Sequence, residues 1–220
     1  IDPLQARAVV SDVEPRSSFL VRPPVANASC VLVALAVEQP AFDADQASRF
    51  LLTAEQTGLR VQLVLTKSDL LTPEQQVGLL QRLEGWGYSP VMVSVPTGVG
   101  LDTLRAVLAS EAITVLCGPS GVGKSSLINA LLPGLALRVG AVSGRLQRGR
   151  HTTRHVELHP FSPGARVADT PGFHRPDLPG DARNPEVLIP ELREQLTIHP
   201  CPLRDCSHRY VPGFGFSRAW

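Results

Sequence analysis

Residues 118–126 have the residue types and the spacing that bind phosphate. The stretch GPSGVGKSS fits the pattern G-x-x-x-x-G-K-[ST] through Gly118, Gly123, Lys124 and Ser125. In such a loop backbone N–H groups point at phosphate oxygens, the lysine reaches the β- and γ-phosphates, and the hydroxyl coordinates Mg²⁺. A strand-like apolar run precedes the stretch and a helical pattern follows it, which favours this role over a chance glycine-rich turn. The expected ligand contacts are Gly118, Pro119, Ser120, Gly121, Val122, Gly123, Lys124, Ser125 and Ser126.

The stretch TKSD, residues 66–69, can read a purine base. It follows the apolar run VQLVL and so lies at a strand's carboxyl end, where ligands bind in open α/β sheets. The Asp69 carboxylate can accept hydrogen bonds from the ring N–H and exocyclic amine of guanine, while Lys67 lays its stem along the base; Thr66 completes the expected contacts. A wrong base would leave a buried carboxylate unpaired, so the motif favours guanine over adenine. An ATP-dependent protein is the alternative.

The stretch SVPTG, residues 94–98, ends another apolar run and predicts a third loop at the same edge. Backbone N–H groups at Ser94 and Val95 would meet the base oxygen. This motif is the least specific of the set, because a plain strand-to-helix turn has the same composition.

Two later stretches can respond to a γ-phosphate. DTPG places Asp169 to hold Mg²⁺ through water and the Gly172 N–H to contact the phosphate. GRHTTR, residues 149–154, offers Thr152 or Thr153 as a further Mg²⁺ ligand. An ordinary Asp-Pro-Gly turn and a solvated polar loop are the alternatives.

Buried strands that alternate with amphipathic helices must position these loops. Near-continuous apolar runs separated by helices predict a mostly parallel sheet with helices on both faces, an α/β fold. Thr72, Pro73 and Gln75 have the spacing of a capping box with proline at the first helical position. The expected strands are 31–37, 61–65, 90–94, 113–117, 156–159 and 166–169. The expected helices are 43–56, one beginning at 72, 101–109, 124–132 and 184–195.

Composition excludes several classes. The 220 residues are 43% hydrophobic, enough for a globular core, and 21 basic against 20 acidic side chains create no global field. The apolar runs are far shorter than the roughly 20 residues of a membrane-spanning helix. Four cysteines indicate a reducing compartment rather than a disulfide framework, and Cys30 and Cys117 lie in strands where they are expected to pack. The first residue is Ile1, so we expect a preceding part of the protein.

The order TKSD, SVPTG, GPSGVGKS, GRHTT, DTPG resembles that of the circularly permuted, small-subunit-dependent GTPases of the RsgA/YjeQ type. The resemblance implies a P-loop NTPase fold in which the usual first strand follows the usual last helix, which explains why the phosphate loop comes late. Permutation leaves the packed elements unchanged. The domains it implies are 1–27, the remnant of a truncated N-terminal OB-fold with its linker; 28–180, the permuted GTPase domain; and 181–220, a partial C-terminal helical and zinc-binding segment.

The resemblance also implies an activity. A protein of this type hydrolyses GTP to GDP and phosphate, binds the small (30S) ribosomal subunit and its 16S rRNA late in maturation, and leaves after hydrolysis. A monomer is expected, in the bacterial cytoplasm or the chloroplast stroma. The alternative is a nucleotide-gated RNA- or ribosome-binding module, or a truncated remnant with negligible turnover.

The resemblance leaves the water-orienting group open. Where familiar GTPases have a glutamine after the DxxG motif, this chain has Phe173, which cannot orient water. His151, beside the threonines that would bind Mg²⁺, is the candidate, with Lys124 and Gly172 as the other catalytic residues. A solvent-facing loop histidine is the alternative. Intrinsic turnover should therefore be slow, and the small subunit is expected to stimulate it.

The resemblance further implies a zinc segment with ligands Cys201, Cys206 and His208. Phe214 stands where the family has a further cysteine, so the set lacks a fourth ligand unless His199 or water completes it. A basic cluster around the 149–154 loop either contacts rRNA phosphates or is a solvated face. It consists of Arg138, Arg145, Arg148, Arg150 and Arg154.

Overall fold

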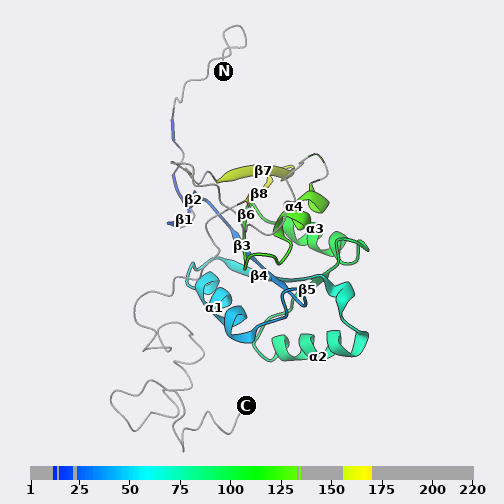
Figure 1. Ribbon diagram of the computed structural model, residues 1–220. Coiled ribbons are helices and arrows are strands. Elements are labelled where there is room, and N and C mark those ends of the chain that lie inside the picture. Colours follow the sequence, from blue (N-terminus) through cyan, green and yellow to red (C-terminus); the bar gives the residue numbers. More distant parts are fainter. Residues whose placement is uncertain (1–11, 14, 22–23, 133, 135–155, 170–220) are drawn as a thin grey trace, which may run out of the picture.

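The computed structural model describes residues 12–13, 15–21, 24–132, 134 and 156–169 (Figure 1). The helix expected at 184–195 lies outside these residues. None of the helices in the described part of the chain has the length and apolarity that a membrane span requires.

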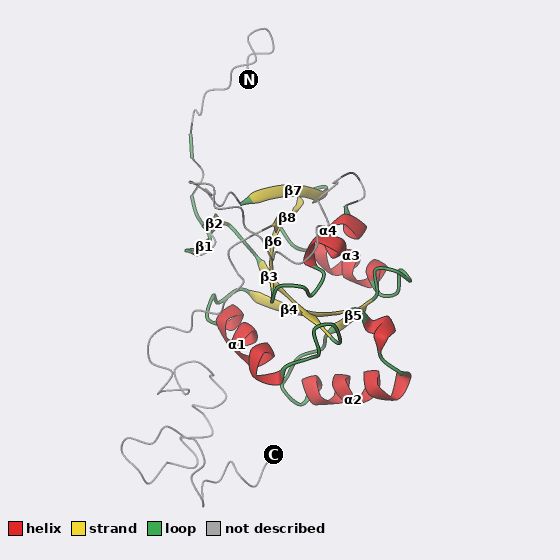
Figure 2. Cartoon of the chain, viewed as in Figure 1, coloured by secondary structure: helices red, strands yellow, loops and turns green. Residues whose placement is uncertain are grey.

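One mixed sheet organises the described residues. Its strand order is β5-β4-β3-β6-β8-β7, and every neighbouring pair is parallel except β7 and β8 (Figure 2). The strands are β3 (Cys30–Ala36), β4 (Arg60–Thr66), β5 (Val91–Val93), β6 (Ile113–Cys117), β7 (Glu157–Ser162) and β8 (Ala165–Asp169). The predicted mostly parallel sheet is confirmed.

Helices cover both faces of the sheet (Figures 1 and 2). One apolar core contains the buried residues of α3 (Leu101–Ala109) and α4 (Lys124–Leu131), and the other contains those of α1 (Ala44–Glu55) and α2 (Pro73–Glu84). Every residue of β3 is buried, and from Val31 to Ala36 the side chains alternate between the two cores. A strand covered on both faces has no polar side, which is why these strands read as continuous apolar runs.

The helix starts follow from local chemistry. The Thr72 hydroxyl accepts the Gln75 N–H at 3.3 Å, and the Gln75 side chain accepts the Thr72 N–H at 2.9 Å, with Pro73 at the first position of α2. The predicted capping box is therefore confirmed. The Asp43 carboxylate accepts the Gln46 N–H at 3.0 Å at the start of α1.

A short hairpin precedes the sheet and packs on it. Its strands are β1 (Phe19–Leu20) and β2 (Val25–Ala26). Leu20 and Val25 are buried in a third core against Val115 of β6 and Ala168 of β8. The hairpin thus shares a core with the sheet, and the domain boundary at 27/28 stays a prediction.

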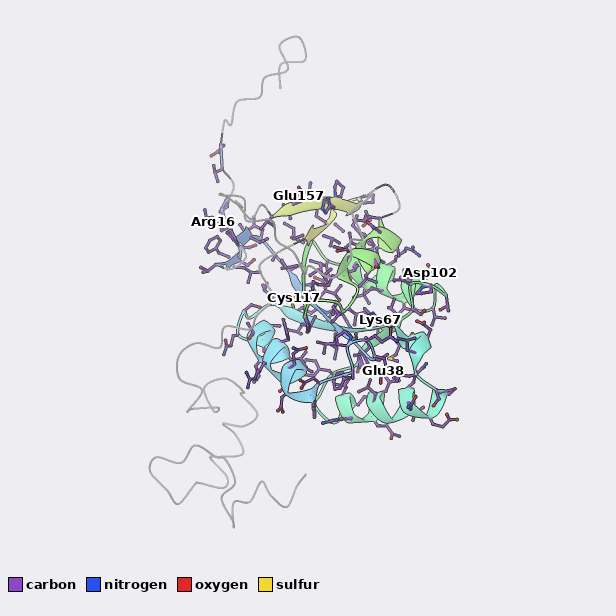
Figure 3. The ribbon with its side chains drawn as sticks, in the orientation of Figure 1. Arg16, Glu38, Lys67, Asp102, Cys117 and Glu157 are labelled. Atoms are coloured by element: carbon purple, nitrogen blue, oxygen red, sulfur yellow. The ribbon has the colours of Figure 1, made fainter. Side chains whose placement is uncertain are left out.

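Cys30 and Cys117 are free, buried thiols, as expected for packing residues. Burial, assisted by the nearby Glu111 carboxylate, raises the pKa of the Cys30 thiol to about 12, and burial raises the pKa of the Cys117 thiol as well. Figure 3 labels Cys117, the last residue of β6, near the middle of the molecule. Neither thiol is disposed to be a reactive thiolate.

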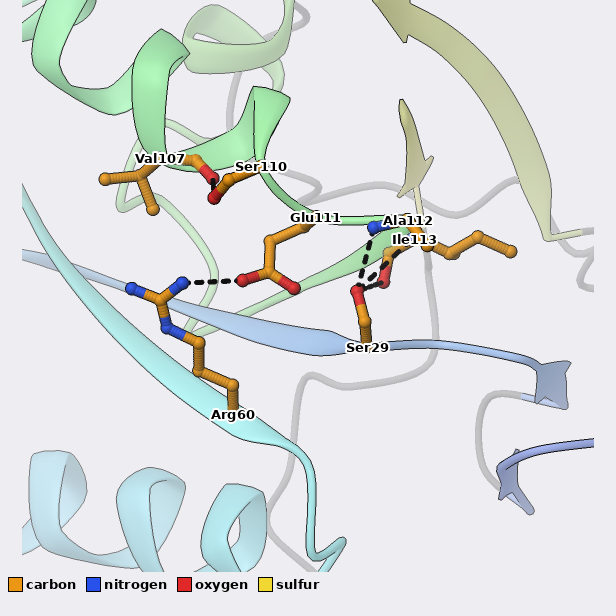
Figure 4. Close-up of polar contacts among 7 residues, drawn as sticks. All are labelled: Ser29, Arg60, Val107, Ser110, Glu111, Ala112 and Ile113. Atoms are coloured by element: carbon orange, nitrogen blue, oxygen red, sulfur yellow. Dashed lines mark hydrogen bonds and ion pairs between the residues drawn. The ribbon is translucent and has the colours of Figure 1, made fainter. Parts of the chain in front are cut away.

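Polar contacts tie the α3–β6 connection to the amino-terminal edge of the sheet (Figure 4). Arg60 donates to the Glu111 carboxylate at 2.7 Å. The Ser29 hydroxyl oxygen accepts the N–H groups of Ala112 at 3.0 Å and Ile113 at 3.4 Å. In the permuted order this connection joins α3 to β6, and these hydrogen bonds hold the connection against the sheet.

Candidate nucleotide-binding site

The loops predicted to bind nucleotide leave the same edge of the sheet. Thr66 ends β4, Val93 ends β5 and Cys117 ends β6, and these strands are parallel neighbours or share β3 as a neighbour. The chain runs from β3 outward to β5, then resumes at β6 on the other side of β3. Such a reversal opens a crevice outside the carboxyl ends of the strands, where ligands bind in α/β sheets. The 118–126 loop emerges from β6 at this point.

Glycine is required where the phosphate loop leaves β6. Gly118 has φ 139°, and a Cβ there would lie 2.1 Å from the Ala34 carbonyl oxygen of β3. Any side chain would therefore push the loop off the neighbouring strand. The φ angles of Gly121 and Gly123, 81° and 92°, also belong to the left-handed region that favours glycine.

Lys124 folds back over the loop. Its ammonium donates to the carbonyl oxygens of Gly118 at 2.8 Å and Pro119 at 2.6 Å, so a positive charge lies within the arc of the loop. Lys124 is also the first residue of α4, and Ser125 follows it in the first turn. The N-terminal end of the helix dipole adds to the attraction for anions.

The 66–69 loop, predicted to read the base, contacts the phosphate loop directly. The Thr66 hydroxyl donates to the Val122 carbonyl oxygen at 2.6 Å, although the residues are 56 positions apart. The Lys67 ammonium donates to the Gly121 carbonyl oxygen at 2.9 Å and to that of Gln39. Figure 3 labels Lys67 and also Glu38, which precedes Gln39 in the loop after β3. The two motifs therefore form one site.

Asp69 lies in a short 3-10 helix, Ser68–Leu70, that follows β4. Lys67 caps this turn with φ 60°, and the Gln76 side chain donates to the Ser68 carbonyl oxygen at 2.9 Å. The Asp69 side chain is exposed, and its carboxylate accepts no hydrogen bond within the described part of the chain. It is thus open to a ligand.

The 94–98 loop offers fewer donors than the sequence indicates. Ser94 is buried, and its N–H donates to the Val99 carbonyl oxygen at 3.0 Å. Pro96 has no N–H. Val95, whose N–H meets no partner among the described residues, is the donor left for a ligand.

Comparison with known proteins identifies the family. A family model described as RsgA GTPase matches residues 13–179. The chain belongs to the RsgA GTPase family. It is 69% identical over 220 residues to the small ribosomal subunit biogenesis GTPase RsgA of Synechococcus sp. (strain CC9311), covering 100% of this chain and 72% of that protein. The corresponding protein of Parasynechococcus marenigrum (strain WH8102) is 66% identical, with 100% and 74% covered.

Solved structures of similar proteins share the fold. The crystal structure of YjeQ from Thermotoga maritima matches with a TM-score of 0.70 at 31% identity, over 95% of this chain and 70% of that one. YloQ, a circularly permuted GTPase, matches with a TM-score of 0.65 at 28% identity, over 94% and 66%. The predicted permuted P-loop fold and the predicted class of enzyme, a GTPase, are confirmed, and an RsgA GTPase uses GTP, GDP and Mg²⁺.

Several predicted site residues fall outside the described part of the chain. Asp169 ends β8 next to β6, so its backbone lies at the same edge of the sheet as the phosphate loop. The residues outside are His151, Thr152, Thr153, Gly172, Phe173, His199, Cys201, Cys206, His208, Phe214 and the arginines 138, 145, 148, 150 and 154. Among the residues that are described, no group of His, Cys, Asp and Glu is placed to hold a metal ion. The roles of the residues outside stay predictions.

Sequence reasoning missed the loop after β3. The Gln39 carbonyl oxygen accepts from Lys67, and the Pro40 ring lies 3.8 Å from where a Gly121 Cβ would be. The loop after β3 therefore packs against one side of the phosphate loop. Its position could have indicated this role, because β3 is the strand from which the strand order runs in both directions, and ligands bind beside such a strand.

Proposed function

We propose that this chain hydrolyses GTP during late maturation of the small ribosomal subunit and dissociates from the subunit after hydrolysis. The observation that carries the proposal is the contact of Thr66 and Lys67 with the phosphate loop, which makes the base-reading and phosphate-binding motifs one site. The names of the matched relatives, small ribosomal subunit biogenesis GTPases, support the choice of partner.

The residues fit a guanine nucleotide. The phosphate loop presents the N–H groups of Val122 and Gly123, which have no protein partner in the described part of the chain, and Lys124 supplies a positive charge beside them. Asp69 pairs with the guanine donors, and the Val95 N–H bonds the base oxygen. The combination discriminates against adenine, because adenine would leave the Asp69 carboxylate without donors.

Mg²⁺ would be held by Ser125, Asp169 and Thr153, or Thr152 in its place. When bound, the ion neutralises charge that develops on the phosphates. Groups of the protein itself do the rest: the Lys124 side chain holds the phosphates, and the Gly172 backbone N–H contacts the transferred group. His151 orients the attacking water, since Phe173 occupies the position of the usual glutamine.

A hydrolysis assay with and without purified small subunits tests the activity. We expect slow release of phosphate by the chain alone and a strong increase with subunits, lost in Lys124→Ala. Flat rates in the presence of subunits would instead support a nucleotide-gated binding module. Asp69→Asn tests the base: if the preference for GTP over ATP survived this change, the assignment of Asp69 would be wrong.

The C-terminal segment would complete the partner contacts. We assign Cys201, Cys206 and His208 to a zinc ion whose fourth ligand is His199 or water, and the arginine cluster to rRNA phosphates. The protein would act as a monomer in the cytoplasm. Metal analysis of the purified chain and of Cys206→Ser tests the zinc assignment, and a steep loss of subunit binding with salt tests the arginines.

A further inference from the structure

Two helices on one face of the sheet each begin at a loop that is predicted to bind the nucleotide. α3 follows the 94–98 loop, which would meet the base oxygen, and α4 begins at Lys124 in the phosphate loop. The two helices lie side by side and share one apolar core (Figure 1). The position of α4 relative to α3 therefore affects the separation between the part of the site for the base and the part for the phosphates.

The start of α3 is tied to the sheet. Gly100 immediately precedes α3 with φ 74°, and a Cβ there would lie 1.9 Å from the Met92 carbonyl oxygen of β5. The Ser94 N–H donates to the Val99 carbonyl oxygen at 3.0 Å, which closes the loop before the helix. These contacts hold α3 and the 94–98 loop together at the end of β5.

Arg105 of α3 contacts the C-terminal end of α4. Its guanidinium donates to the Ala130 carbonyl oxygen at 2.7 Å through Nη2 and to the Asp102 carboxylate at 2.7 Å through Nη1. Carbonyl groups in the last turn of a helix have no partner within the helix, and the last turn of α4 contains no basic side chain. Arg105 thus supplies, from α3, a charged donor at the negative end of the α4 dipole.

The Arg105 contact is directional, whereas the apolar packing between the helices is not. Leu104 of α3 and Leu127 of α4 are buried in the same core, but the hydrophobic effect that holds them together has no preferred direction. A charge-assisted hydrogen bond weakens steeply as its angle is distorted. Because Asp102 holds the second nitrogen of the same planar group, the guanidinium has a fixed orientation toward Ala130.

We propose that Arg105 is a positioning residue that sets the separation between the base-binding and phosphate-binding parts of the site by holding α4 against α3. The proposal rests on the proposed nucleotide site. Arg105 acts from the opposite end of the helix, because Ala130 lies in the last turn of α4 and Lys124 is its first residue. A ligand that bridges both parts of the site depends on their separation, whereas a ligand that occupies one part does not.

Guanosine, pyrophosphate and GDP distinguish these cases, because guanosine occupies the base part, pyrophosphate the phosphate part and GDP both. Their affinities are measured with Mg²⁺ present, by displacement of a fluorescent guanine nucleotide from the whole chain. Arg105→Met keeps the aliphatic stem and removes the donors. We expect it to lower the GDP affinity by about fivefold and to leave the affinities for guanosine and pyrophosphate unchanged.

Matched variants separate this effect from a general loss of structure. Arg82→Met removes an exposed arginine from α2, where it contacts the Trp86 ring, and should leave all three affinities unchanged. Asp102→Asn frees the second nitrogen of Arg105 and should lower the GDP affinity alone, by about twofold. This variant serves if Arg105→Met does not fold, because the Asp102 side chain is 97% exposed.

Three results would overturn the proposal. The first is an unchanged GDP affinity in Arg105→Met, or in Asp102→Asn if Arg105→Met does not fold. The second is an equal loss for pyrophosphate and GDP, because Arg105 would then act on the phosphates alone through the charge at the end of α4. The third is a loss of GDP affinity in Arg82→Met as large as in Arg105→Met. Failure of the wild-type chain to bind GDP would overturn the proposed function instead.

Discussion

Arg60 and Glu111 form an ion pair of 2.7 Å across the amino-terminal edge of the sheet, with the Glu111 side chain only 9% exposed. Glu111 lies in the α3–β6 connection, which exists because β6 and the phosphate loop follow β3, β4 and β5 in the chain. The pair therefore fastens the segment that the permuted order creates.

Glu111→Ala is expected to lower the free energy of unfolding by about 1–2 kcal/mol, since the pair is partly shielded from water. The matched control is Asp102→Ala, which breaks the exposed pair with Arg105 at 2.7 Å and should cost about 0.5 kcal/mol. Urea unfolding of both variants measures the difference. Equal losses of unfolding free energy in the two variants would mean that the Arg60–Glu111 pair stabilises the α3–β6 connection no more than an exposed pair would.

Replacing glycine by alanine should have opposite effects at Gly118 and at Gly78. Gly118→Ala places a Cβ 2.1 Å from a backbone oxygen and should abolish nucleotide binding or folding. Gly78→Ala lies inside α2, where a Cβ meets nothing within 4 Å, and should stabilise the protein by about 0.5–1 kcal/mol. Thermal unfolding with and without GDP checks both. A Gly118→Ala protein that bound GDP normally would contradict the close approach of the loop to β3.

Stability should fall in alkaline solution because of the buried thiols. In the unfolded chain Cys30 ionises at its ordinary pKa of 9.0, whereas burial raises the pKa in the folded chain to about 12. The contribution of Cys30 to the free energy of unfolding is therefore fully present below pH 9.0. It falls by about 1.4 kcal/mol per pH unit as the pH rises from there toward about 12.

Urea unfolding under reducing conditions, from neutral pH to about pH 10, measures this slope. Cys117, whose thiol pKa burial also raises, contributes in the same direction. Cys30→Ala should make the slope shallower while Cys117 is intact. A slope that did not respond to Cys30→Ala would show that the thiol is not shielded in the folded state.

The N-terminal hairpin should behave as part of the core. Leu20 is 6% exposed and packs with residues of β6 and β8, so Leu20→Ala should cost about 2–5 kcal/mol. Phe19, on the same strand, is 51% exposed and contacts Arg16 through its ring face, and Phe19→Ala should cost about 0.5 kcal/mol. Chemical denaturation compares them. A neutral Leu20→Ala would place the hairpin outside the cooperative unit and favour the boundary at 27/28.

The sheet and its helices could be predicted because their physical causes are local. Strands buried on both faces are largely apolar, and the spacing of Thr72 and Gln75 predicts a helix start within four residues. The observed α1, Ala44–Glu55, and β5, Val91–Val93, differ from the expected ranges only at their ends. Fraying and capping determine where a helix or strand ends, and the amino-acid composition of a segment does not predict its last residue.

The finer features of the site depend on contacts between distant residues. The commitment of the Ser94 N–H to Val99 and the bond from Lys67 to Gln39 arise from loop geometry that no motif encodes. The contact of Thr66 with Val122 was missed for the same reason, because the two residues are 56 positions apart. The glycine-rich loop was predictable because phosphate chemistry constrains its composition directly.

The order of strands has a consequence during synthesis on the ribosome. Within the stretch from Cys30 to Val93, β3 pairs with β4 and β4 pairs with β5, so this half of the sheet can assemble through contacts that are close in sequence. The other edge of β3 then stays open until β6 is translated and adds to it. The nascent chain thus completes the loop that we propose recognises a purine before the loop that we propose holds its phosphates.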